Sequence, residues 1–257
     1  TWLVFMKNRL EIAKDLLSKD GAIYVQLDYN EVHYCKVLMD EIFGRENFQR
    51  EIIWRIGWVS GFKTADKNWI RNHDTILFYS KDKNSLEFYK KYIPYPKDYV
   101  RRDGSKPEGE GYPYEDTWNC SDLDQLHSIA IVSFTKEKVG DFKGQKNEAL
   151  IKRIIDAHTK EGDIVLDFFS GTGTTASVAH KLKRQWITVE QIDEQIDKQL
   201  RRLNKVLKGD QTGISKSVGW KGGGDFVYLE LMEWNENLVN RIQSAESKED
   251  LQELWTI

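Results

Sequence analysis

The chain has 257 residues, of which 40% are hydrophobic, with 38 basic and 41 acidic side chains and a net charge of −3. This length allows one large domain or two small ones, and the near balance of charge excludes a histone-like polycation and a disordered acidic tail. Two cysteines, Cys35 and Cys120, are too few for a disulfide framework and lack the spacing of a zinc site, which favours a reducing cytoplasm.

The first 80 residues alternate between helical and strand patterns. Apolar residues recur at three- and four-residue spacing from Leu3 to Leu17, which predicts a helix ending near Ser18. Because this pattern is already under way at Thr1, we expect that the protein begins upstream; the alternative is a helix capped by Thr1. In chain order, we then expect a strand at 22–27, a helix at 31–43, and strands at 51–56 and 74–79. This alternation favours an α/β layered fold with a parallel sheet.

Residues 81–143 interrupt the alternation and predict an insertion carried on the sheet. All four prolines lie between 94 and 113, and residues 81–102 contain seven basic and three acidic side chains interleaved with tyrosines. Basic side chains suit phosphates and aromatic rings suit stacking, so this segment is a candidate DNA contact; the alternative is a solvated loop whose tyrosines pack on the domain. The expected DNA-binding residues are Lys90, Lys91, Arg101 and Arg102.

Regular elements resume after the insertion. We expect helices at 147–158, 174–182 and 247–255, and strands at 164–167, 186–190 and 226–231. A further, charged helix should follow the strand at 186–190 and end near residue 208. The basic run 181–184 is typical of a solvated helix end, where cations are favourable.

The sharpest local signal is the run Asp-Phe-Phe-Ser-Gly-Thr-Gly-Thr-Thr at 167–175, in which a strand passes through a glycine turn into a helix. Glycines let the backbone approach a ligand closely, and the start of a helix offers free N–H groups. Glu190 follows the next strand, where a doubly wound fold holds ribose hydroxyls. The pattern therefore predicts a cofactor that contains a nucleoside.

Two cofactor classes fit the glycine turn. It satisfies the loose dinucleotide pattern G-x-G-x-x-G/A, so an NAD-dependent oxidoreductase is one alternative, and a turn without ligand is another. Asp167 would repel a pyrophosphate but can accept hydrogen bonds from the ammonium of S-adenosylmethionine. In addition, only 67 residues follow Glu190, so the remaining strands must come from the N-terminal half, in a circularly permuted order. Both points favour a methyltransferase.

These motifs resemble those of the amino-group DNA methyltransferases. The run 162–175 looks like their cofactor-binding motif, and 144–150 resembles their Gln-Lys-Pro-Glu-x-Leu element, with Asn147 in place of the proline. Segments 10–44 and 72–81 are similar to the family's segments after its catalytic loop, and 219–228 to a tail element of modification subunits of type III restriction systems. The resemblance covers essentially the whole chain in the permuted order of the beta group.

The resemblance implies a Rossmann-like, circularly permuted α/β fold that depends on S-adenosylmethionine. Residues 1–80 would form the catalytic half, 81–143 the inserted target-recognition region, and 144–257 the S-adenosylmethionine-binding half with a C-terminal tail. The implied activity is methyl transfer to the N6 amine of adenine in duplex DNA, with a second modification subunit and a restriction subunit as partners. The implied cofactor-binding residues are Lys146, Asn147, Asp167, Phe168, Phe169, Ser170, Gly171, Thr172, Gly173, Thr174, Glu190 and Gln191.

One departure concerns the chemistry. The family's catalytic Asp-Pro-Pro-Tyr tetrapeptide occurs nowhere in the sequence, and the resemblance places it before Thr1, so no catalytic residue is assigned. We therefore expect this chain to be inactive alone, with a central strand of the sheet unpaired and an exposed edge at 164–167 or 22–27. The alternatives are a decayed gene and a non-catalytic DNA-binding or specificity module.

Overall fold

The computed structural model describes residues 2–55, 67–118, 137–140, 144–230, 234–245 and 247–254. The chain divides into two compact units, 1–223 and 224–257. The first unit contains α1 (Trp2–Leu16), β1 (Ala22–Leu27), α2 (Val32–Phe43), the 3-10 helix η1 (Arg45–Asn47), β2 (Phe48–Arg55), β3 (His73–Ser80), β4 (Tyr92–Ile93), β5 (Tyr112–Pro113), β6 (Thr117–Trp118), α4 (Glu148–His158), β7 (Ile164–Asp167), α5 (Thr174–Lys181), β8 (Gln185–Thr188) and α6 (Asp193–Leu207). The second contains α7 (Trp234–Gln243) and α8 (Lys248–Leu254).

The strands of the first unit form three separate sheets. The larger sheet has the order β1-β3-β2-β6, in which β3 runs antiparallel to both β1 and β2, and β6 runs parallel to β2. A separate pair, β7 and β8, is parallel, and β4 and β5 form an antiparallel ribbon. The larger sheet is therefore mixed, and the prediction that its strands run parallel is wrong. Side chains alternate with period two in strands of either direction, so the hydrophobic pattern could not reveal that β3 enters between β1 and β2 in the opposite sense.

Different helices cover the two faces of the larger sheet. Leu77 and Tyr79 of β3 are buried in a cluster with apolar side chains of α1 and α2. The alternate residues Ile76 and Phe78 are buried in a second cluster, which includes Leu150 of α4. The alternation of side chains along β3 thus places α1 and α2 on one face of this sheet and α4 on the other.

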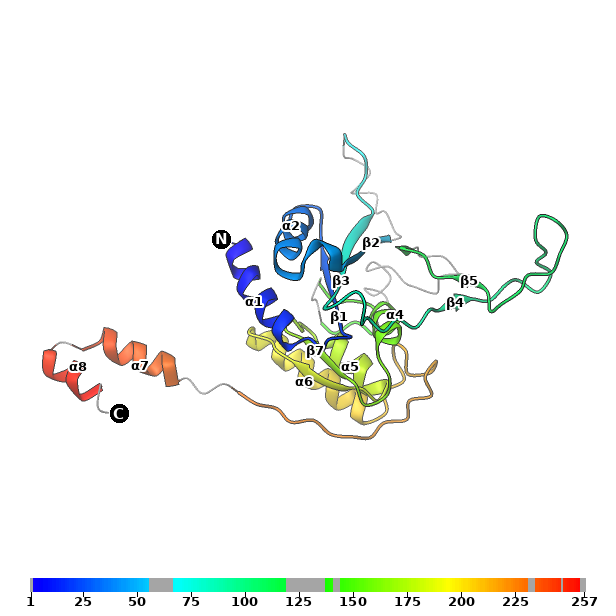
Figure 1. Cartoon of the computed structure of the whole chain (residues 1–257). Helices are drawn as coiled ribbons and strands as arrows, with labels where there is room; N and C mark the ends of the chain where they lie inside the picture. The colour runs from blue at the N-terminus through cyan, green and yellow to red at the C-terminus, as the bar shows by residue number, and fades with distance from the viewer. Residues whose placement is uncertain are drawn as a thin grey trace. The chain divides into compact units, whose positions relative to one another are not determined.

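Helix α4 connects the larger sheet to the β7–β8 pair. Leu150 belongs to the cluster on the sheet, whereas Ile155 is buried with Val178 and Ala179 of α5, in a cluster against which Val165 of β7 packs. Figure 1 shows α4 next to α5, with α6 below them. The position of α4 therefore sets how the two sets of strands lie in the first unit.

The C-terminal elements differ from those predicted. Residues 226–230 form no strand, so the prediction of a strand at 226–231 is wrong over this range, and Val227 and Leu229 are 81% and 82% exposed. Their alternating apolar pattern has no ladder partner among the described residues of the second unit, and a strand requires one. Helix α7 was not predicted, whereas α8 matches the predicted terminal helix. Cys120 and Ile56 lie outside the described residues, and no described helix is long and apolar enough to cross a membrane.

A half-buried histidine, His158, joins the end of α4 to the larger sheet. The Tyr24 hydroxyl lies 2.6 Å from Nε2 of His158, and Nδ1 lies 2.8 Å from the carbonyl oxygen of Glu87. Because a carbonyl oxygen can only accept, Nδ1 carries the proton, and the neutral ring accepts from Tyr24 through Nε2. Burial lowers the pKa of His158. The folded state therefore favours the neutral ring.

Acidification should destabilise the first unit through this histidine. A histidine whose pKa falls on folding contributes stability above its unfolded pKa of about 6.5, and that stability is lost as the pH falls below this value toward the folded pKa. We expect His158 to lower the free energy of unfolding between pH 7 and pH 5 by up to about 1.4 kcal/mol per pH unit. The variant His158→Gln should lose this component in urea unfolding measured at both pH values, and an unchanged pH dependence in the variant would contradict the assignment.

Candidate functional site

The glycine turn lies between β7 and α5 and requires glycine at Gly173. This residue has φ +72°, and a Cβ added there would lie 2.6 Å from Cγ of Gln199. Its N–H donates to the carbonyl of Ser170 at 2.8 Å, which closes the turn just before α5 begins. A side chain at 173 would both strain the backbone and push α6 away, so the close contact between turn and α6 depends on this glycine.

Glu190 lies against the same turn from the end of β8. One of its carboxylate oxygens accepts from the N–H of Gly171 at 2.7 Å, and the other accepts from the N–H groups of Gln191 at 2.9 Å and Ile192 at 3.0 Å. Asp167, at the end of β7, accepts from the N–H of Phe169 at 3.0 Å. The structure thus brings together the three features singled out in the sequence: Asp167, the glycines and Glu190.

The remaining turn residues differ in their exposure. Ser170, Thr172 and Thr174 are buried, whereas Phe169 is 50% exposed and its ring centroid lies 6.0 Å from that of Phe5 in α1. Phe168 contacts Phe169 with ring centroids 5.0 Å apart. The two aromatic rings therefore lie at the open side of the turn.

Sequence reasoning missed the part of α6 that holds this turn. Gln199 accepts from the Ser170 hydroxyl at 2.8 Å and donates to the Thr188 hydroxyl at 2.7 Å, so it ties the turn to β8. Gln195, Gln199 and Arg202 are buried on one face of α6. Polar residues at core positions of a helix, spaced four and three apart, are the signal that could have revealed this contact.

Lys146 and Asn147 approach the turn from the start of α4. The Thr174 hydroxyl donates to the Lys146 carbonyl at 3.4 Å, and Asn147 is the N-cap of α4, its Oδ1 accepting from the N–H of Ala149 at 2.7 Å. Burial lowers the pKa of the Lys146 amine, while the nearby carboxylates of Asp74 and Asp167 act in the opposite direction. The segment that resembles the family's Gln-Lys-Pro-Glu-x-Leu element is therefore a neighbour of the turn.

A buried charge cluster lies directly behind these residues. Glu148 and Lys181 form an ion pair at 2.7 Å, and Glu148 and Arg202 form another at 2.8 Å, with exposed side-chain fractions of 1%, 0% and 6% for Glu148, Lys181 and Arg202. Arg202 also donates to the Thr174 hydroxyl at 2.8 Å, and the N–H of Ile214 donates to Glu148 at 3.0 Å. The prediction that Lys181 belongs to a solvated helix end is wrong, because its ammonium turns inward to the carboxylate of Glu148.

The predicted DNA-binding residues are all exposed on or near the β4–β5 ribbon. Lys90 and Lys91 come directly before β4, and Arg101 and Arg102 lie in the loop that connects β4 to β5. None of these four side chains has an ion-pair partner within the described part of the chain, so their charge is free to meet an anion.

Tyrosines of the same loop pack on one another. The rings of Tyr95 and Tyr99 are stacked with centroids 5.3 Å apart, and Tyr112 contacts both edge-on at 4.8 and 5.4 Å. These contacts favour a packing role for the three tyrosines over stacking on bases.

β1 and β7 are among the strands that have a free edge within the described residues. β1 pairs only with β3, and β7 only with β8. Ile164 and Leu166 of β7 are 62% and 36% exposed, and every residue of β1 is half-buried. These are the two strands for which an exposed edge was predicted.

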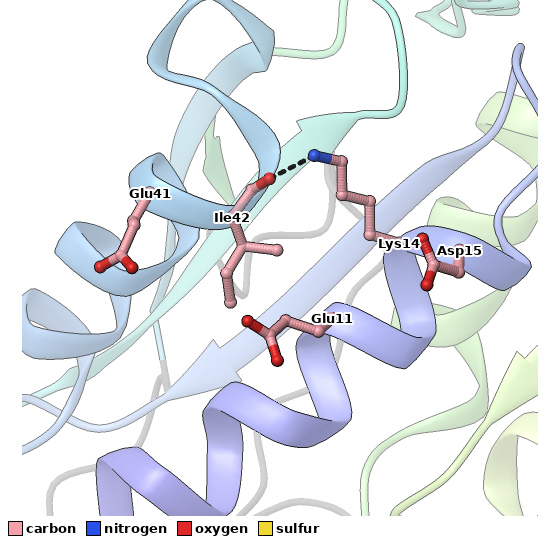
Figure 2. A pocket seen from close by; sticks show the side chains of 5 residues that line it. All are labelled: Glu11, Lys14, Asp15, Glu41 and Ile42. Atoms are coloured by element: carbon pink, nitrogen blue, oxygen red, sulfur yellow. Dashed lines mark hydrogen bonds between the residues drawn. The ribbon is translucent and has the colours of Figure 1, made fainter.

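A pocket lies between α1 and α2, and none of its lining residues belongs to the glycine turn or to Glu190. It is lined by Glu11, Lys14, Asp15, Glu41 and Ile42 (Figure 2). The ammonium of Lys14 donates to the carbonyl of Ile42, in the last turn of α2. This contact satisfies a helix-end carbonyl that has no partner within the helix. The pocket is therefore explained by the packing of the two helices.

Comparison with known proteins places this geometry in a family. The sequence profile described as DNA methylase matches residues 1–201. The chain belongs to the DNA methylase family. The chain is 32% identical, over 99% of its own length, to a probable type III restriction-modification enzyme HindVI Mod subunit of Haemophilus influenzae, and it spans 50% of that protein. It is 30% identical to the type II methyltransferase M1.MboII of Moraxella bovis, with 80% of each chain covered.

Solved structures show the same fold. The structure of M1.HpyAVI in complex with SAM matches with a TM-score of 0.55 at 22% identity, covering 78% of this chain and 83% of M1.HpyAVI. The cytosine-N4-specific PvuII DNA methyltransferase matches with a TM-score of 0.54 at 16% identity, and the match covers 85% of this chain and 74% of the PvuII enzyme. The predicted Rossmann-like α/β methyltransferase fold is therefore confirmed.

Removing the central charge of the buried cluster should cost much of the stability of the fold. Glu148→Gln leaves Lys181 and Arg202 buried without the carboxylate that pairs with both of them, and we expect the free energy of unfolding to fall by about 3–5 kcal/mol. The matched control is Glu161→Gln, which removes an exposed pair with Lys183 at 3.4 Å and should cost at most about 1 kcal/mol. Urea unfolding measures both, and equal losses in the two variants would contradict the role of Glu148.

Proposed function

We propose that this chain is the cofactor-binding and DNA-contacting part of a methyltransferase that modifies the N6 amine of adenine in duplex DNA. The observation that carries the proposal is the junction of Asp167, the glycine turn and Glu190 at the ends of β7 and β8, in a chain of the DNA methylase family. Likeness to a probable Mod subunit over 99% of the chain supports a modification subunit of a type III restriction system. Its partners would then be a second modification subunit and a restriction subunit, in a reducing cytoplasm.

The residues at the turn suit S-adenosylmethionine, which supplies a methyl group bonded to positively charged sulfur. A carboxylate offers about four acceptor positions, and Glu190 uses three of them on backbone N–H groups, so it is already oriented to accept from a ribose hydroxyl. Asp167 is a suitable acceptor for the ammonium group. Gly173 keeps the turn tight enough for the backbone to approach the ligand.

The β4–β5 ribbon is the proposed DNA contact. Lys90, Lys91, Arg101 and Arg102 are exposed cations without ion-pair partners in the described residues, which suits phosphate binding. Phosphate contacts would orient the duplex and leave the reading of bases to other residues.

The catalytic step would need a further segment. The sequence contains no Asp-Pro-Pro-Tyr, and β1 and β7 each have a free edge. We propose that a strand from upstream of Thr1 pairs with these edges and carries the catalytic residues. A DNA-binding module without methyl transfer is the outcome expected if no such segment exists.

Two substitutions test the cofactor assignment. Glu190→Ala and Asp167→Ala should each weaken S-adenosylmethionine by roughly 1.5–3 kcal/mol, the range for hydrogen bonds to charged groups. Isothermal calorimetry measures the affinity on the protein that carries its upstream segment, with NADH as the competing ligand class. Glu194→Ala serves as control, because this exposed carboxylate pairs with Lys198 and should leave binding unchanged. Wild-type affinity in both test variants would show that the site is misplaced.

The second test concerns activity. Residues 1–257 alone should bind S-adenosylmethionine weakly or not at all and should not methylate DNA, because the group that aligns the target amine with the methyl is missing. The free edges should also favour aggregation. Restoring the upstream segment, joined or as a separate piece, should recover solubility and transfer of tritiated methyl groups to unmethylated duplex DNA. Robust transfer by residues 1–257 alone would refute the proposal and require a different catalytic set.

A further inference from the structure

The guanidinium of Arg153, in the middle of α4, lies over two aromatic rings of the predicted insertion. Its Cζ is 4.0 Å from the ring centroid of Tyr114 and 5.3 Å from that of Trp118. Tyr114 directly follows β5 and Trp118 lies in β6, so both rings belong to the chain that returns from the β4–β5 ribbon. A planar cation is attracted to the face of an aromatic ring, and arginine suits this stacking better than lysine does.

The two rings differ in how they are held. Trp118 is buried in the cluster that also contains Leu150 of α4, and its Nε1–H donates to the carbonyl of Glu115 at 2.8 Å. Tyr114 is 37% exposed, and its N–H donates to the carbonyl of Lys91 at 3.0 Å, which closes the base of the ribbon. Arg153 therefore connects a ring anchored in the core to a ring that belongs to the ribbon.

The outgoing chain of the ribbon is also attached to α4 and the residues after it. The N–H of Tyr89 donates to the carbonyl of Ala157 at 2.8 Å, and Nδ1 of His158 lies 2.8 Å from the carbonyl oxygen of Glu87. Lys160 pairs with Glu87 at 3.2 Å. The outgoing chain thus keeps a backbone hydrogen bond to α4 whatever its side chains are, whereas Tyr114 contacts α4 through the side chain of Arg153.

The ribbon carries the cations that are the proposed DNA contacts. In Figure 1 the ribbon begins beside α4. Its far end is held together by the three packed tyrosines of the loop and by a turn in which the N–H of Gly104 donates to the carbonyl of Arg101 at 2.8 Å. A shift at the base of such a ribbon would therefore move all of the cations together: Lys90, Lys91, Arg101 and Arg102.

We propose that Arg153 is a positioning residue for DNA, which holds the β4–β5 ribbon in place on α4 by stacking on Tyr114 and Trp118. The inference rests on the proposed function and adds a residue that acts on DNA binding through the ribbon. Helix α4 has 11 residues, which is about 16 Å of helix. Because its other end contacts the glycine turn through the hydrogen bond from Thr174, one helix would set the distance between the DNA contact and the cofactor.

The test compares affinity for duplex DNA with affinity for S-adenosylmethionine, on the protein that carries its upstream segment. Arg153→Met keeps a long apolar side chain on α4 but removes the cation. We expect it to weaken binding of a labelled mixed-sequence duplex about tenfold in fluorescence anisotropy, within the range for a cation on aromatic rings. Calorimetry should show unchanged affinity for S-adenosylmethionine. The salt dependence of duplex binding should also stay the same, because Arg153 would contact no phosphate itself.

Further variants separate the stacking from other effects. Tyr114→Phe retains the ring and should bind the duplex like the unmodified protein, whereas Tyr114→Ala should weaken it. Combined with Arg153→Met, Tyr114→Ala should cost less than the sum of the two single losses, because both remove the same contact. Lys152→Met is the matched control. It removes the same charge one position away on α4, where Lys152 pairs with Asp156, and should leave duplex affinity unchanged.

Several results would overturn the inference, and each points to a different cause. Unchanged duplex affinity in Arg153→Met would exclude the positioning role, and equal losses for the duplex and S-adenosylmethionine would mean that Arg153 acts only on the fold. A salt dependence less steep by about 0.9, the value for one phosphate, would make Arg153 a direct DNA contact instead. The proposed function is tested separately by Lys90→Gln combined with Lys91→Gln. Unchanged duplex affinity in that variant would overturn the ribbon as the DNA contact, and the role of Arg153 with it.

Discussion

The carboxylate of Glu148, buried between Lys181 and Arg202, is the interaction on which the arrangement of the first unit depends. Burying three charged groups carries a large desolvation cost, which is offset only when the geometry is good and the remaining hydrogen bonds are made. Here the two ion pairs are 2.7 and 2.8 Å long, and the carboxylate also accepts from the N–H of Ile214. Arg202 donates to the hydroxyl of Thr174, and Lys181 donates to the carbonyl of Thr212. One carboxylate therefore joins α4 to α5, α6 and the segment after α6. Because α4 also packs on the larger sheet, the charge cluster fixes the start of α4 relative to the glycine turn.

Side chains from outside the glycine turn hold it in place. Glu190 binds it from β8 through Gly171, Gln199 binds it from α6 through Ser170, and Gly173 allows the backbone to pass close to α6. Groups that are already oriented lose little conformational freedom on binding. The entropy cost of ordering such a turn around a ligand is therefore small.

Sequence patterns predicted the local features and failed where a tertiary partner decides the outcome. The strand at 22–27 and the turn at 167–175 were found because hydrophobic runs and glycine spacing are properties of neighbouring residues. Lys181 was assigned to solvent because nothing near it in the sequence reveals Glu148, 33 positions away. The apolar alternation at 226–231 suggested a strand, yet a strand exists only where another edge pairs with it. The direction of β3 was missed for a related reason, since the period of side chains is the same in parallel and antiparallel strands. Of the site, the turn and Glu190 were predicted, whereas Gln199 and Arg202 of α6 were missed, because their partners lie on other elements.

The free edges of β1 and β7 connect the fold to the chemistry. A strand of a parallel sheet normally has both neighbours and both faces covered, yet Ile164 and Leu166 of β7 are exposed and β1 is only half-buried. A segment that paired parallel to β7 would run in the same direction, so the residues after it would emerge at the edge where Asp167 and the glycine turn begin. That edge is where the methyl group of a ligand held by Asp167 and Glu190 would lie. The pairing that covers the apolar edge is thus also the pairing that would place reactive groups beside the cofactor. One missing strand would then account both for the exposed surface and for the absence of a catalytic residue in the described site.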